Sequence, residues 1–112
     1  LELEQFRQHP PFPLRYDQIE WYKEQIKKFQ DHKYRAEIEK ETAEQFLRDV
    51  RVKALHVTIH HDPSNFGSQK RYLAIDEAHK QISINTFSAR RCSVIIKLLK
   101  NILNNNRKFT NS

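Results

Sequence analysis

Glycine, cysteine and methionine are scarce in this sequence of 112 residues, which holds one glycine, one cysteine and no methionine. A single cysteine, Cys92, excludes an internal disulfide and favours a reducing compartment such as the cytosol or the nucleus. No apolar run approaches the roughly 20 residues that a membrane-spanning helix needs, so no membrane span is expected. The first residue, Leu1, suggests a fragment cut from a longer protein.

Acidic residues are outnumbered by basic ones. The chain has 20 Lys and Arg against 14 Asp and Glu, a net charge of +6. Because each cation set against a phosphate can release a condensed counterion, this excess favours a polyanionic partner. Surface charge also serves solubility alone, so the excess indicates a class of partner and not its identity.

Three of the four prolines, Pro10, Pro11 and Pro13, lie within the first 16 residues. Proline cannot donate a backbone hydrogen bond, so we expect an extended arm here. We favour an arm packed across the domain surface through Phe6, Phe12 and Leu14, with a linker or a ligand for a partner as the alternatives. A helix is predicted from Asp17 to Gln30, because Asp17 and Glu20 form a capping-box pattern and apolar residues follow at steps of three and four.

The continuation of this helix beyond Gln30 is open to two interpretations. A seven-residue repeat runs through the segment at Tyr22, Phe29, Ala36, Ala43 and Val50. Its companion positions, however, include Lys33 and Lys40, which interrupt an apolar seam. A separate helix over residues 34–49, capped by Asp31, fits the apolar residues at least as well. We therefore expect two helices, with one coiled-coil-like helix as the alternative.

From Arg51 the apolar period changes to two. Leu55, Val57 and Ile59 alternate with polar residues, which is typical of a half-buried strand. The turn-forming residues 62–65 and the only glycine follow it. Two more strands are predicted over residues 71–76 and 80–87, and the short connections imply an antiparallel sheet of three strands.

The stretch from Phe87 to Leu103 carries the clearest helical pattern in the chain. Its apolar residues are Val94, Ile95, Leu98, Leu99, Ile102 and Leu103. They form one stripe, while the opposite side is basic, and Ser88 stands at the N-cap position. The sequence thus predicts a helix that faces the core on one side and solvent on the other.

These elements predict an α+β fold: an N-terminal helical extension, then helix, three-stranded antiparallel sheet and helix, in the order α-β-β-β-α. The predicted organisation is an arm and N-terminal helix over residues 1–30, the α-β-β-β-α domain over residues 31–105, and a polar tail over residues 106–112.

The order of these elements resembles that of the double-stranded RNA-binding domain, whose two helices pack on one face of such a sheet. The run from Gly67 to Tyr72 stands near the family's Gly-Pro-x-His loop between the first two strands. Ser88-Ala89-Arg90-Arg91-Cys92-Ser93 stands where the family has the basic Ser-Lys-Lys-x-Ala-Lys opening of its second helix. The resemblance covers about two thirds of the chain and depends mainly on element order.

What the resemblance implies is a non-catalytic basic module that binds double-stranded or structured RNA through the N-terminus of the last helix and the first strand–strand loop. The candidate contacts are Lys70, Arg71, Arg90, Arg91, Lys97 and Lys100. Duplex RNA is recognised by its shape, 2′-hydroxyl groups and phosphates, for which spaced cations suffice. The alternative is a protein interaction or dimerisation module that uses the helical region 17–49. Either would act inside the cell, in the nucleus or cytoplasm.

Histidine and cysteine indicate neither a metal site nor an enzyme. His56 and His60 would share a strand face but lie roughly 13 Å apart at about 3.3 Å per residue, too far to share one ion. Cys92 lacks the Cys/His spacing that would support nucleophilic catalysis. We expect no cofactor, no metal and no enzymatic activity.

Overall fold

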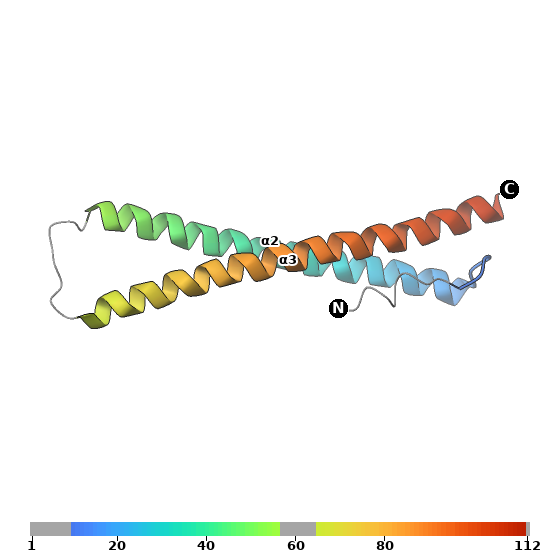
Figure 1. Ribbon diagram of the computed structural model, residues 1–112. Helices are drawn as coiled ribbons and strands as arrows, with labels where there is room; N and C mark the ends of the chain where they lie inside the picture. Colours follow the sequence, from blue (N-terminus) through green and yellow to red (C-terminus); the bar gives the residue numbers. More distant parts are fainter. Residues whose placement is uncertain (1–9, 57–64, 112) are drawn as a thin grey trace. The chain divides into compact units, whose positions relative to one another are not determined.

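Two long helices make up the part of the chain that the structure describes (Figure 1). This computed structural model describes the backbone of residues 10–56 and 65–111 and the side chains of residues 10–51 and 72–111. Helix α2 spans Tyr16–His56 and helix α3 spans Asn65–Thr110. The chain divides into two compact units: unit 1 joins Leu1–Tyr34 with Ser88–Ser112, and unit 2 is Arg35–Phe87. Neither described helix is long and apolar enough to span a membrane.

The predicted α+β fold is wrong, because residues 10–56 and 65–111 contain no strand. The predicted strands 71–76 and 80–87 lie inside α3, and the first predicted strand belongs to α2 as far as His56. Its continuation from residue 57 and the turn residues 62–64 lie outside the described residues. The run after Asn65 lacks proline and is rich in strong helix formers such as Ala74, Ala78 and Gln81.

The burial of side chains along α3 follows the period of a helix and not the alternation of a strand. A strand would turn Ile82 and Ile84 to the same side, whereas Ile82 is half-buried and Ile84 is 48% exposed. The two isoleucines lie on different sides of the helix. The predicted polar tail also begins inside α3, which continues to Thr110.

Helix α2 is continuous over its 41 residues, so the two-helix interpretation is wrong and the coiled-coil-like alternative is confirmed. Lys33 and Lys40 are both half-buried. A lysine can pack its aliphatic stem along an apolar seam while its ammonium group reaches water, so these two residues do not end the helix. Residues 30–33 contain no glycine or proline that would stop it.

The start of α2 lies one residue earlier than predicted, with a different cap. The backbone N–H of Arg15 donates to the Gln18 side-chain oxygen at 2.9 Å, which is the reciprocal half of a capping box. The Ile19 N–H donates to the Arg15 carbonyl at 3.0 Å and closes the first turn. Asp17 lies in that turn, where the positive end of the helix dipole stabilises its carboxylate.

A seven-residue repeat describes the buried side of both helices. The buried residues at this spacing are Tyr22, Phe29, Ala36 and Ala43 in α2, and Ala78, Asn85, Cys92, Leu99 and Asn106 in α3. A strict interval of seven keeps one narrow face of a slightly underwound helix turned to the same side, as in a coiled coil. The repeat therefore fixes which face each helix buries.

Unit 1 has a core of large side chains. Leu14, Tyr22, Phe29, Cys92, Ile95, Leu99 and Ile102 form one buried cluster. The arm contributes to it as expected, because Leu14 is buried and Phe12 packs against the cluster, while Phe6 lies outside the described residues. The Leu14 N–H donates to the Asn106 Oδ1 at 2.8 Å, so the start of α2 lies beside the end of α3 and the two segments run antiparallel within the unit.

Unit 2 has a core of small side chains. Among the side chains of this unit that the structure describes, the buried ones are Ala36, Ala43, Ala78 and Asn85. The Asn85 amide donates to the Gln81 carbonyl of its own helix at 2.9 Å, so its donor is satisfied without a partner on α2. The larger apolar side chains Ile38, Phe46, Leu73, Ile84 and Phe87 are exposed to varying degrees. The described part of this unit therefore buries Ala36, Ala43 and Ala78, keeps Leu47, Val50, Ile75 and Ile82 half-buried, and exposes the remaining large apolar side chains.

Truncation of Leu99 tests the core of unit 1. Leu99 is fully buried, so Leu99→Ala should lower the free energy of unfolding by about 2–5 kcal/mol through lost burial and the resulting cavity. The matched control is Leu73→Ala on the same helix. Leu73 is 68% exposed, so its truncation should cost less than about 0.5 kcal/mol in urea unfolding. Equal losses at the two positions would show that the core lies elsewhere.

Proline at position 32 tests the continuity of α2. In a separate helix capped by Asp31, His32 would be the first helical residue, where proline is well tolerated. In a continuous helix, His32→Pro removes a hydrogen bond and clashes with the preceding turn, so it should cost about 3 kcal/mol or more. His32→Ala is the control, and thermal unfolding followed by circular dichroism gives the comparison. A proline variant as stable as the alanine variant would restore the two-helix interpretation.

Candidate functional site

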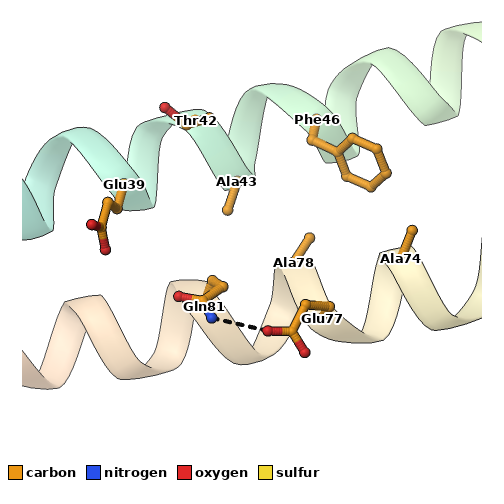
Figure 2. A pocket seen from close by; sticks show the side chains of 8 residues that line it. All are labelled: Glu39, Thr42, Ala43, Phe46, Ala74, Glu77, Ala78 and Gln81. Carbon is orange, nitrogen blue, oxygen red and sulfur yellow. Dashed lines mark hydrogen bonds between the residues drawn. The ribbon is translucent and has the colours of Figure 1, made fainter.

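An apolar groove runs between the two helix segments of unit 2 (Figure 2). Its lining residues are Glu39, Thr42, Ala43 and Phe46 from α2, and Ala74, Glu77, Ala78 and Gln81 from α3. Ala43 and Ala78 project from the facing sides of the two helix segments. The groove has a volume of about 510 Å³, and we call it the alanine groove.

Polar side chains at the alanine groove hydrogen-bond along their own helices. The Gln81 Nε2 donates to the Glu77 Oε1 at 2.9 Å, and the Thr42 hydroxyl donates to the Ile38 carbonyl at 2.9 Å. Both bonds join residues one turn apart. The apolar surface that the groove exposes comes mainly from Phe46 and the half-buried Ala74, because Ala43 and Ala78 are buried.

Exposed apolar side chains also lie outside the alanine groove on both helices. A second depression on α2 shares Thr42 and Phe46 with the alanine groove and adds Ile38. On α3, Leu73 and Ile84 lie one turn before and two turns after Glu77, on the same side of the helix. Ile38, Phe46, Leu73 and Ile84 are between 38% and 68% exposed. The apolar surface is therefore wider than the groove itself.

The charges around this surface are acidic. The two depressions are lined by the carboxylates Glu39, Glu41, Asp49 and Glu77, and their described lining residues include no Lys or Arg. All four carboxylates are exposed. In a chain of net charge +6, this is a local reversal of sign.

The predicted RNA-contact residues separate into two groups. Arg90, Lys97 and Lys100 are exposed on α3, and Arg91 is half-buried. Lys70 and Arg71 belong to the N-terminal part of α3. Because α3 begins at Asn65, Arg90 and Arg91 lie far inside the helix, so the predicted anion site at a helix N-terminus near Ser88 is wrong. No strand–strand loop carries Lys70 and Arg71.

Exposed polar and basic residues continue the row that begins at Arg90. Arg90, Lys97, Asn104 and Asn111 recur at intervals of seven, with Lys100, Asn101, Arg107 and Lys108 beside them. We call these eight residues, all exposed, the basic face of α3. Asn104, Arg107, Lys108 and Asn111 also line a cleft of about 470 Å³. Sequence reasoning missed Arg107, Lys108 and Asn111 because residues 106–112 were interpreted as a tail, although the interval of seven was present.

Cys92 is a free, buried cysteine in the core of unit 1. Burial raises the pKa of its thiol, against the weaker effects of a side-chain hydrogen bond with Ser88 and of the Lys33 charge. Burial also raises the pKa of the Tyr22 hydroxyl. His79 lies exposed on α3, while His60 and His61 lie outside the described residues. Among the described residues, no three His, Cys, Asp or Glu side chains cluster as metal ligands would.

Alkaline pH should destabilise the protein through Cys92. The folded thiol has the raised pKa, so the folded state holds this proton more tightly than the unfolded state does. The contribution is complete at neutral pH and is lost as pH rises from about 8.5, where an unfolded thiol ionises. The urea midpoint of the wild type should therefore fall over this range more steeply than that of Cys92→Ala. Parallel pH profiles would contradict the assignment.

Comparison of the chain with protein-family models, curated proteins and solved structures finds no match. The element order behind the resemblance to the double-stranded RNA-binding domain also differs from the two helices observed. The alanine groove and the basic face are the two surfaces from which a function follows.

Proposed function

We propose that the chain is a non-catalytic interaction module that binds an amphipathic helix of a protein partner in the alanine groove. The observation that carries the proposal is the packing of unit 2, whose buried residues, among those described, are all small while Ile38, Phe46, Leu73 and Ile84 stay exposed. This is the protein-interaction alternative from the sequence, moved from the region 17–49 alone to a surface built by both helices.

Energetics support an external partner for unit 2. Most helical stability in proteins comes from packing an apolar face, and alanine offers little area to pack. Complete burial of a large apolar side chain contributes about 1.5–3 kcal/mol, and a half-exposed one forgoes part of that gain. A helix seated over Phe46, Leu73 and Ile84 would recover it. Aromatic and aliphatic side chains beside a groove are the usual anchors of helix-in-groove recognition.

The charges define the chemistry of the partner. Glu39 and Glu77 line the alanine groove itself, and Glu41 and Asp49 line the neighbouring depression. Complementary charge at an interface rim raises the rate of association and excludes like-charged competitors. The expected partner is therefore a helix with apolar residues at steps of three and four, flanked by Lys or Arg.

Two synthetic helices test this proposal. They share the same apolar residues and differ only in flanks of lysine or glutamate, and binding to the full chain is followed by fluorescence polarisation. The lysine-flanked helix should bind at least about 10-fold more tightly, because the acidic rim of the groove repels the glutamate-flanked helix. Equal affinity of the two helices, or binding of neither, would contradict the proposal.

A groove-filling substitution locates the binding site. Ala74→Leu places a larger side chain in the groove and should weaken binding of the lysine-flanked helix by at least about 10-fold. Ala89→Leu is the matched control, because Ala89 is also half-buried on α3 but lies in unit 1. A purified chain that sediments as a dimer, and becomes monomeric on Ala74→Leu, would assign the groove to a second copy instead.

A further inference from the structure

We propose that the basic face of α3 binds the phosphate backbone of nucleic acid. The surface belongs to unit 1, and it is independent of the alanine groove of unit 2. It retains three of the cations proposed from the sequence, Arg90, Lys97 and Lys100, and adds Arg107 and Lys108 near the end of the helix.

The first observation is a segregation of charge between helices. No Asp or Glu follows Glu77 in the sequence, whereas seven Lys or Arg do. In the same unit, residues 10–34 carry four Asp or Glu against five Lys or Arg. The ion pairs Arg15–Asp17 and Lys23–Glu20, both 3.6 Å long, lie there. The positive excess of unit 1 therefore comes from α3.

The second observation is that the cations share one side of the helix. Lys97 precedes the fully buried Leu99 by two residues, about 200° of helical rotation, so the basic face lies opposite the core. From Arg90 to Lys108 it extends about 27 Å at 1.5 Å per residue. One strand of a duplex carries a phosphate about every 3.4 Å of axis, so this length faces several phosphates.

The exposed asparagines make the face more than a row of charges. Asn101, Asn104 and Asn111 stand between the cations, and their amides can donate to phosphate oxygens and accept from sugar hydroxyl groups. The negative end of the helix dipole stabilises cations in the last turn. This effect alone can explain why Arg107 and Lys108 lie there. It does not account for Arg90 and Lys97, which lie several turns earlier.

Nucleic acid fits this face better than a lipid surface does. A helix that lies on a membrane inserts its apolar side among the acyl chains. The apolar side of this segment, Ile95, Leu99 and Ile102, is instead buried in the core of unit 1. What remains for a ligand is a mainly polar and basic surface, in which Val94 and Phe109, 48% and 51% exposed, are isolated apolar side chains and form no continuous face for insertion.

Charge reversal on two matched surfaces tests the proposal. Fluorescence anisotropy with labelled RNA and DNA duplexes measures binding to the full chain at low salt. Lys97→Glu with Lys100→Glu should weaken binding at least about 10-fold and reduce the slope of log affinity against log salt by about 2. Lys27→Glu with Lys28→Glu, exposed lysines on α2 in the same unit, makes the same change in net charge and should change affinity less than about 3-fold.

Circular dichroism of both double variants serves as the folding control, because equal helical signals would separate a loss of binding from a loss of folding. Equal losses in the two variants would overturn the proposal, because net charge and not the basic face would then determine binding. Absence of binding to both duplexes at low salt would overturn it too. Binding to phosphatidylserine vesicles without binding to either duplex would assign the surface to membranes and reject nucleic acid.

Discussion

A pair of long helices has one seam in which to bury side chains, and this constraint governs the rest of the molecule. Every residue on the seam has to recur at an interval that keeps it facing the neighbouring helix. Here the interval is seven, from Tyr22 to Ala43 in α2 and from Ala78 to Asn106 in α3. Because the described helices pack mainly against each other within each unit, the size of the seam residues determines how much apolar surface the unit can bury.

The seam differs sharply between the two units. In unit 1 it carries Tyr22, Phe29 and Leu99, and the arm adds Leu14, so large apolar groups are removed from water. In unit 2 it carries Ala36, Ala43 and Ala78, which leave an open groove flanked by exposed apolar side chains. The first unit satisfies its own packing, and its outer side is left free for charge. The second leaves apolar surface uncovered, which a folded partner would remove from water.

Much of unit 1 was predictable from the sequence. The stripe after Phe87 correctly placed Ile95, Leu99 and Ile102 in the core, and the proline-rich arm packs through Leu14 as expected. The stripe was nevertheless drawn too wide, because Val94 is 48% exposed. A single neighbouring helix covers a narrower arc than the sheet that was predicted to lie beneath it.

Unit 2 was mispredicted for a related reason. A short alternation of apolar and polar residues fits a strand, and a seam made of alanine and asparagine has too little hydrophobicity to reveal the competing period of seven. Lys33 and Lys40 hid the same period in α2, because a half-buried lysine stem is indistinguishable in sequence from an exposed one. The alanine groove escaped prediction because it depends on small residues about 35 positions apart, Ala43 and Ala78, facing each other.

The most direct test of this account is the backbone Cα chemical shift of residues 71–87, measured by NMR on the full chain. These residues lie in the N-terminal half of α3 and cover the two strands that alternation would predict. The account predicts helical, downfield secondary shifts without interruption from residue 71 to residue 87. Upfield shifts over residues 71–76 and 80–87, separated by a turn at 76–79, would contradict it.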